Sequence, residues 1–132
     1  MEIALLGHMG RDDAAAANFV RHGHRVHGLG LWRNPGLVDK CETSGGQYHV
    51  IDSITKVELV ADYVEAIAPD MFLTNFDDAF AAGAKDAVKK RIADGRLREL
   101  WMPFPDQAAA QIESDKFYLR KIVQKIAPQY NP

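Results

Sequence analysis

The amino-acid sequence predicts an α/β protein with a mostly parallel sheet of five strands and helices on both faces. Short apolar runs typical of buried strands alternate with longer runs in which apolar residues recur at helical spacing. Such alternation builds strand–helix–strand units, whose strands pair in parallel and whose helices cover the sheet. The length of 132 residues fits one domain with its own core. We therefore expect an open, Rossmann-like sheet.

Five strands are expected. The first, residues 2–6 (EIALL), is apolar almost throughout and stops at Gly7, which suggests burial on both faces. Pro103 and Pro105 end the last strand, because proline cannot continue a hydrogen-bonded ladder. The remaining strands are short runs at residues 25–29, 48–51, 70–74 and 98–102.

Four helices are expected. Residues 12–22 contain four alanines, the strongest helix former, and stop at Gly23. The other three runs carry apolar side chains on one face and cover residues 56–68, 80–93 and 107–126. The last is the longest, and its apolar side chains are available for burial. Residues 33–46 are predicted to form a loop, because they contain Asn-Pro-Gly and Ser-Gly-Gly turn signals.

Composition excludes several classes of protein. A hydrophobic content of 47% and a net charge of −2 exclude intrinsic disorder, and no apolar run is long enough to span a membrane. With 16 basic and 18 acidic side chains, we expect neither nucleic acid nor an anionic membrane surface as a partner. The single Cys41 excludes an internal disulfide and is expected to be a packed thiol in a reducing cytoplasm.

Ligands of open parallel sheets bind beyond the carboxyl ends of the strands. In the loop after the first strand, Gly7 and Gly10 allow a tight turn, and Arg11 offers a guanidinium suited to phosphate or carboxylate. Amides at the start of the next helix would face the same anion. The spacing departs from the dinucleotide fingerprint at Met9 and Asp12, so an ordinary strand-to-helix turn remains an alternative.

Other polar residues have two interpretations each. Asn34 and Gly36 belong to a turn signal that by itself indicates only a turn. Asn75, Asp77 and Asp78 follow the fourth strand, where they would orient a substrate amine or hydroxyl, or would cap the next helix.

Two further groups of residues favour a structural interpretation. His22, His24 and His27 flank a turn at the amino end of the second strand, the wrong side of the sheet for the site, so we expect a polar turn and no metal. Lys116, taken alone, is typical of a solvated helix face.

Four segments, in chain order, carry a resemblance to a known family. They are residues 9–13 (Met-Gly-Arg-Asp-Asp), 33–36 (Arg-Asn-Pro-Gly), 75–80 (Asn-Phe-Asp-Asp-Ala-Phe) followed by Gly83, and 103–116 with Pro-Phe-Pro, an alanine-rich turn, Gln-Ile-Glu and Asp-Lys. They resemble the Gly-Gly-Arg-Glu-His, Gly-Asn-Pro-Gly, Gly-Pro-Glu-x-Pro-Leu and Phe-Gly-Pro…Glu…Ser-Lys segments of phosphoribosylamine–glycine ligases (glycinamide ribonucleotide synthetases), members of the ATP-grasp superfamily.

The resemblance covers essentially the whole chain and has clear departures. The Asn-Pro-Gly and Ala-Ala-Gln-Ile-Glu segments match best. Met9 stands where the family has glycine, Asp13 for histidine, Asn75 for glycine, Asp77 for glutamate and Ala79 for proline.

What the resemblance implies is a pre-ATP-grasp, substrate-side domain over residues 1–105 and, over residues 106–132, a helix leading toward an ATP-grasp domain beyond this sequence. The family joins glycine to 5-phosphoribosylamine at the expense of ATP in purine synthesis. ATP and Mg²⁺ would be bound mainly by the ATP-grasp domain, with Lys116 approaching the ATP phosphates, and this chain alone would be inactive. No catalytic residue is assigned. The implied substrate-binding residues are Gly7, Gly10, Arg11, Asp12, Asn34, Gly36, Asn75 and Asp77.

Two other hypotheses stay open. The departures from the family motifs suit a stand-alone nucleotide- or ribose-phosphate-binding module without catalysis. A flavodoxin-like or response-regulator-like domain is disfavoured by the long final helix and by the lack of an acidic cluster after the first strand.

Overall fold

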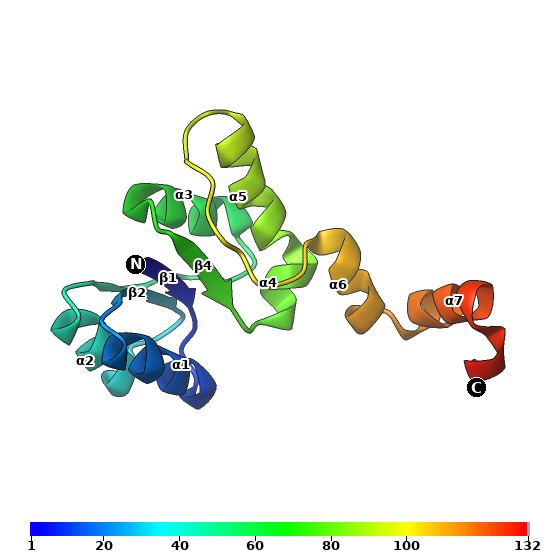
Figure 1. The fold of residues 1–132 in the computed structure, drawn as a ribbon, viewed down its shortest axis with the longest axis horizontal. Helices are drawn as coiled ribbons and strands as arrows, with labels where there is room; N and C mark the ends of the chain where they lie inside the picture. The colour runs from blue at the N-terminus through cyan, green and yellow to red at the C-terminus, as the bar shows by residue number, and fades with distance from the viewer. Residues whose placement is uncertain (132) are drawn as a thin grey trace.

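A computed structural model describes residues 1–131 and shows a parallel sheet flanked by helices (Figure 1). The strand order is β3-β2-β1-β4, and every pairing is parallel. All carboxyl ends therefore lie at one edge of the sheet, with β1 between β2 and β4. The strands are β1 (Glu2–Leu6), β2 (Arg25–Gly30), β3 (Tyr48–Val50) and β4 (Met71–Thr74).

Helices cover both faces of the sheet, as predicted. One face packs Leu5 and Val26 against Leu37 and Cys41, and the other packs Ala4 and Phe72 with the second group of helices. The helices of the first face are α1 (Gly10–Arg21) and α2 (Pro35–Thr43), and those of the second are α3 (Val57–Ile67), α4 (Asp77–Ala82) and α5 (Ala84–Ala93).

Cys41 is a packed thiol, as predicted. It is fully buried and free, and burial raises the pKa of its thiol to about 11. The side chain therefore acts as a small core residue at neutral pH.

The prediction of a fifth strand is wrong, because the sheet has four. In residues 98–102 only Trp101 pairs with the sheet, through a parallel bridge to Met71. The Trp101 N–H donates to Asp70 O at 2.9 Å, and Phe72 N–H donates to Trp101 O at 2.9 Å. The next donor of a parallel ladder would be residue 103, which is proline and has no N–H. The ladder ends there.

The loop predicted over residues 33–46 contains α2 instead. The Asn34 side chain caps this helix by accepting hydrogen bonds from Gly36 N at 3.0 Å and Leu37 N at 3.3 Å, and Pro35 occupies the first turn. Asn-Pro-Gly is thus a helix start, although the same letters commonly mark a turn.

Two predicted helices are each divided in two. The run at 80–93 breaks at Gly83, whose φ of 91° is left-handed, so α4 and α5 are separate helices. The run at 107–126 breaks at Asp115, which caps the next helix by accepting from Phe117 N and Tyr118 N. The resulting helices are α6 (Gln107–Ser114) and α7 (Lys116–Ile126).

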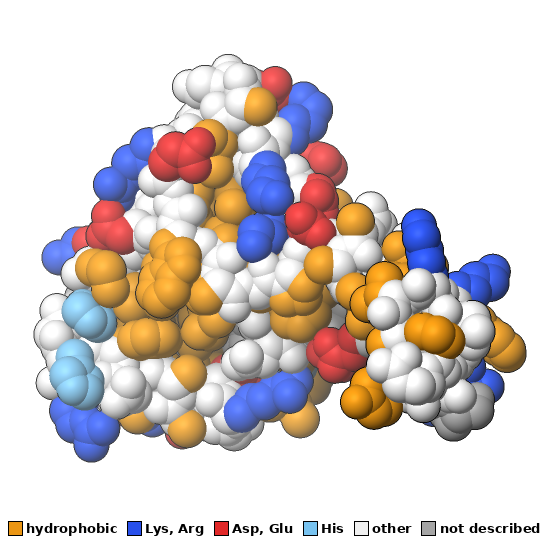
Figure 2. Space-filling model, turned by 45° about the vertical axis from the view of Figure 1, so that its right-hand side comes forward, with side chains coloured by type: hydrophobic (Ala, Val, Ile, Leu, Met, Phe, Trp, Pro, Cys, Tyr) orange, Lys and Arg blue, Asp and Glu red, His pale blue; other side chains and the backbone are white. Residues whose placement is uncertain are grey.

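The C-terminal helices project from the body (Figure 1). Helix α6 packs on α4 and α5, and Ala110 enters the core. Helix α7 instead contacts chiefly α6 and the short η1 (Pro128–Tyr130), and none of its residues is buried. Apolar and basic side chains therefore share the surface of this projecting part (Figure 2). Of the described helices, none combines the length and the apolar character that a membrane span requires.

The fold makes a testable prediction at Gly46, just before β3. A Cβ at this position would lie 1.9 Å from Val26 O, a backbone atom of β2 that cannot move without breaking the sheet. We expect Gly46→Ala to lower the free energy of unfolding by about 3 kcal/mol, measured by urea denaturation. Gly10→Ala is the control, because its Cβ would meet nothing within 4 Å. Equal urea midpoints for the two variants would contradict the described β2–β3 junction.

Candidate functional site

The loops after β1, β2 and β4 meet at the carboxyl edge of the sheet, where the sequence places the site. Gly7 N–H donates to Leu29 O at 2.8 Å, which joins the first loop to the end of β2. Asn34 Nδ2 donates to His8 O at 3.2 Å. The Arg11 guanidinium reaches the loop after β4 and donates to Asn75 O at 2.7 Å. Three segments far apart in sequence are thus tied into one surface.

Asp12 holds this surface together from inside. Its side chain is fully buried, and its Oδ2 accepts hydrogen bonds from His8 N at 3.0 Å and Met9 N at 2.9 Å. Its Oδ1 accepts from Asn75 Nδ2 at 3.2 Å. Both oxygens are used within the protein, so the geometry gives Asp12 a structural role in place of the ligand contact expected from the sequence.

Gly7 makes room for this arrangement. A Cβ on Gly7 would lie 2.3 Å from the Asp12 Cγ, closer than any side chain can approach. The glycine is required by the packing of the Asp12 carboxylate against the loop.

Of the predicted residues in the loop after β1, Gly10 and Arg11 are the two that face solvent. Both are exposed and open the first turn of α1, where backbone N–H groups lack acceptors within the helix. The positive end of the helix dipole and the Arg11 guanidinium lie at the same place. This combination suits an anionic group such as a phosphate.

Asn34 and Gly36 belong to the second wall of the candidate site, the loop after β2; the loop after β1 is the first wall. Asn34 caps α2 and bonds to the first loop, so its amide is already engaged at both ends. A Cβ on Gly36 would lie 2.6 Å from Asp13 Oδ1, and that carboxylate pairs with Lys40 Nζ at 2.7 Å. Gly36 therefore allows α1 and α2 to approach closely.

Asn75 and Asp77 contribute the third wall. The Asn75 side chain is engaged with Asp12, whereas Asp77 is exposed at the first turn of α4. A carboxylate there stabilises the helix dipole and still faces solvent, so both interpretations of Asp77 are compatible with its position.

Lys116 is not brought to this surface. It begins α7, is exposed, and lies on the part of the chain that projects from the body (Figure 1). Eight of the nine predicted binding residues therefore lie at one edge, and the ninth lies apart.

The three histidines near Gly23 have separate partners. The His22 ring contacts Asn18 O at 2.8 Å, and the His24 ring lies 3.4 Å from the N-terminal amino group. His27 Nε2 lies 2.8 Å from Glu2 Oε2. Across residues 1–131, no three His, Cys, Asp or Glu side chains gather in a group that would hold a metal ion.

Three aromatic rings at the edge were missed by the sequence analysis. The His8 ring lies between Trp32 and Phe76, with centroid separations of 3.8 Å and 4.7 Å. These rings follow β1, β2 and β4, and they lie in the order of the strands in the sheet. The Tyr48 hydroxyl holds the backbone beside these three rings, because it donates to Trp32 O at 2.8 Å. The available signal was an aromatic residue in each of three loops already predicted to meet.

His8 is neutral at pH 7 with a defined proton position. Burial lowers the pKa of its imidazole. Leu31 N–H donates to His8 Nδ1 at 3.3 Å, so Nδ1 is the acceptor and the proton of the neutral ring resides on Nε2. Among residues 1–131, the hydrogen bonds of this ring involve Nδ1 alone.

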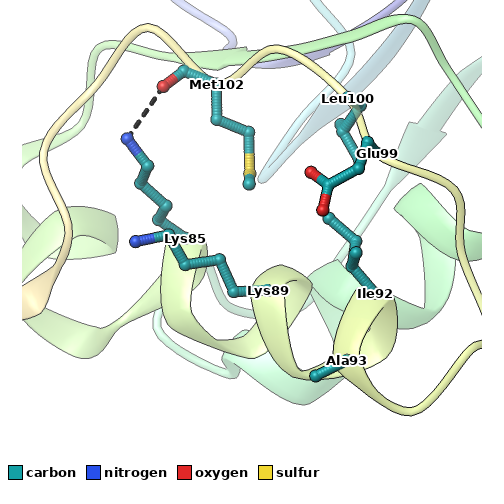
Figure 3. A pocket seen from close by; sticks show the side chains of 7 residues that line it. All are labelled: Lys85, Lys89, Ile92, Ala93, Glu99, Leu100 and Met102. Atoms are coloured by element: carbon teal, nitrogen blue, oxygen red, sulfur yellow. Dashed lines mark hydrogen bonds between the residues drawn. The ribbon is translucent and has the colours of Figure 1, made fainter.

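A cavity lies elsewhere, between α5 and the segment that follows it (Figure 3). Lys85 Nζ donates to Met102 O at 2.9 Å and Phe104 O at 2.6 Å, which fastens that segment to α5. The cavity has a volume of about 480 Å³ and is lined by Lys85, Lys89, Ile92, Ala93, Glu99, Leu100 and Met102. None of the predicted binding residues lines it.

Comparison with known proteins confirms the resemblance predicted from the sequence. No protein-family model matches the chain. The chain is 30% identical over 129 residues, 95% of its length, to a phosphoribosylamine–glycine ligase from Methanosarcina barkeri. It spans 27% of the length of that relative.

Three solved structures share this fold at low sequence identity. A glycinamide-RNase-transformylase T from Mycobacterium tuberculosis matches with a TM-score of 0.68 and 17% identity, over 97% of this chain and 33% of that one. An N5-carboxyaminoimidazole synthetase from Staphylococcus aureus, complexed with ADP, matches with a TM-score of 0.63 and 14% identity. The match covers 96% of this chain and 30% of that one. A leucoanthocyanidin reductase from Vitis vinifera in complex with NADPH matches with a TM-score of 0.57 and 14% identity. The match covers 95% of this chain and 46% of that one. At these identities the likeness shows a shared Rossmann-like fold.

The site makes a testable prediction at Asp12. Replacing Asp12 by alanine leaves the buried N–H of His8 and the N–H of Met9 without their acceptor. We expect Asp12→Ala to lower the free energy of unfolding by about 3 kcal/mol in urea denaturation. Asp77→Ala, which removes an exposed carboxylate from a helix start, should cost no more than about 0.5 kcal/mol. A similar loss of unfolding free energy in both variants would show that Asp12 does not hold the loops of the carboxyl edge together.

Proposed function

We propose that this chain is the substrate-side domain of an ATP-dependent carbon–nitrogen ligase that joins glycine to 5-phosphoribosylamine in purine biosynthesis. The observation that carries the proposal is the 30% identity to a phosphoribosylamine–glycine ligase along 95% of the chain. The geometry agrees with it, because Gly10 and Arg11 face solvent at the carboxyl edge, next to the loop after β4.

Each wall of the edge has a role in this proposal. The backbone N–H groups of Gly10 and Arg11, together with the Arg11 guanidinium, hold the substrate phosphate. Asp77 orients the amine from the third wall. Asp12 and Asn34 fix the loops and do not contact the substrate, because their side chains are engaged within the protein.

ATP and Mg²⁺ are assigned mainly to the part of the ligase beyond these residues. Residues 1–131 bring together no group of three or more His, Cys, Asp or Glu side chains that could hold a metal ion. The relative is more than three times as long as the matched chain, which leaves room for an ATP-grasp domain. Residues 106–132 would lead into that domain, and Lys116 would approach the ATP phosphates from it. The chain alone would then bind substrate without catalysing the reaction.

A second candidate is a nucleotide- or ribose-phosphate-binding module without catalysis. The departures from the ligase motifs at Met9, Asp13, Asn75 and Ala79 favour it. Both candidates place the phosphate at Arg11, and they differ in whether the edge supports ligation.

A chimeric enzyme tests the ligase proposal. The region of the Methanosarcina barkeri ligase that aligns with this chain would be replaced by this chain, and ATP hydrolysis would be measured with both glycine and phosphoribosylamine present. We expect hydrolysis that requires both substrates. In the chimera, Arg11→Ala should lower kcat/KM for phosphoribosylamine at least about tenfold, because it removes a charge-assisted hydrogen bond to the phosphate.

The matched control is Arg21→Ala, which removes an exposed arginine at the other end of α1, where its guanidinium donates to Asn18 Oδ1 at 2.9 Å. It should change kcat/KM by less than about twofold if the effect of Arg11 is local. A chimera that unfolds cooperatively yet shows no substrate-dependent hydrolysis would contradict the ligase proposal. An equal loss of kcat/KM in the Arg11 and Arg21 variants would contradict the phosphate contact.

A further inference from the structure

Asn75, the first residue after β4, contacts two consecutive residues at the start of α1. Its backbone carbonyl accepts a hydrogen bond from the Arg11 guanidinium at 2.7 Å, and its side-chain Nδ2 donates to Asp12 Oδ1 at 3.2 Å. Asp12 is fully buried, whereas Arg11 is exposed. One residue therefore connects the buried carboxylate of the carboxyl edge to the cation that faces solvent.

The direction of the Arg11 side chain depends on this contact. An exposed arginine samples many rotamers unless an acceptor holds it. Within residues 1–131, the acceptor of Arg11 is Asn75 O, and no carboxylate lies within ion-pair distance of the guanidinium. A carbonyl holds the guanidinium without neutralising its charge, and the N–H groups that do not face Asn75 stay available to a ligand.

The Asn75 amide fixes the position of that carbonyl. Asp12 accepts two further hydrogen bonds from backbone N–H groups of the loop after β1, so position 75 has to supply a third donor. An amide supplies it without adding charge. A carboxylate at the same place would set a second anion against Asp12, and like charges in contact repel.

We propose that Asn75 is a positioning residue of the anion site. Its amide binds Asp12, and its backbone carbonyl thereby aims the Arg11 guanidinium at the substrate phosphate. Asn75 acts on the substrate through Arg11, in place of the direct contact that the family resemblance implies. This inference rests on the proposed function, which places the phosphate at Gly10 and Arg11, and it deepens that function by naming what orients the cation.

The first test measures the affinity of the chain for ribose 5-phosphate by calorimetry. Asn75→Ala removes the amide, keeps the backbone carbonyl and adds no charge. We expect binding to weaken about fivefold, because the guanidinium is no longer held in one direction. In a chain that already carries Arg11→Ala, the same change should weaken binding by less than about twofold. The two residues would then be coupled in a double-mutant cycle.

Asn75→Asp adds a signal that depends on pH. Two adjacent carboxyl groups share one proton, so the pKa of the new carboxyl is raised. At about pH 5.5 its protonated form donates to Asp12, and we expect an affinity within about twofold of that of the unsubstituted chain. At about pH 8 its ionised form repels Asp12 and pairs with Arg11, and the affinity should fall at least about tenfold.

Affinities are compared with those of the unsubstituted chain at the same pH, because the phosphate itself titrates near about pH 6. The charged and titratable side chains that face the loop after β4 or belong to it are Arg11, Asp12, His8, Asp77 and Asp78. They are the same in both chains at each pH, so the ratio of affinities isolates position 75.

The matched control is Asn18→Asp. Asn18 Oδ1 accepts from the Arg21 guanidinium at 2.9 Å near the other end of α1, so this change also sets a carboxylate beside an exposed arginine. It should leave the affinity for ribose 5-phosphate within about twofold at both pH values.

A measurement without ligand separates this inference from the proposed function. In ¹⁵N relaxation, the Arg11 Nε–H should be restricted in the unsubstituted chain and mobile in Asn75→Ala. Equal mobility in the two chains would overturn the positioning role, whether or not phosphate binds. Equal weakening of ribose 5-phosphate binding by Asn75→Ala with and without Arg11→Ala would overturn it too. An Arg11 that Asn75 restricts, in a chain whose affinity for ribose 5-phosphate does not change in Arg11→Ala, would overturn the phosphate site instead.

Discussion

The buried carboxylate of Asp12 is the interaction on which the carboxyl edge depends. One oxygen binds two consecutive N–H groups of the loop after β1, and the other binds the amide of Asn75 after β4. A buried carboxylate is tolerated only when donors satisfy it, so this contact fixes both loops at once. It also positions α1, whose first turn presents Gly10 and Arg11 to solvent. The exposed start of α1 and the contacts of the His8 ring with Trp32 and Phe76 depend on that fixed geometry.

Strand order explains why these loops form one surface. Because β1 lies between β2 and β4, the loop after β1 is flanked by the other two, and each contributes one aromatic ring. The opposite end of the chain is arranged differently. Helix α7 leaves the body with no buried residue and with basic and apolar side chains exposed. Within residues 1–131, helix α7 packs chiefly on α6 and η1 and leaves its apolar side chains largely uncovered.

Much of the fold follows from the sequence, and the failures have specific causes. Hydrophobic periodicity predicts β1 and α3 within a residue or so, but it runs on through Gly83 and Asp115 without showing the breaks. The fifth strand fails because Pro103 lacks the next donor, a loss that an apolar run does not reveal. Because the carboxyl ends of parallel strands lie at one edge, the sequence also predicts that Arg11 and residues of the loops after β2 and β4 lie close together. It cannot predict that Asp12 points inward, because its partners are mainly backbone N–H groups, which no residue type identifies.

The central claim is that the ligand phosphate binds at the edge built around Asp12. The most direct measurement is the change in backbone amide shifts of the ¹⁵N-labelled chain on titration with ribose 5-phosphate. The account predicts that the largest changes fall on Gly10 and Arg11, with smaller ones in the loops after β2 and β4, and little change along α5 and the cavity beside it. Shifts concentrated at the α5 cavity, or at the amino ends of the strands, would contradict it.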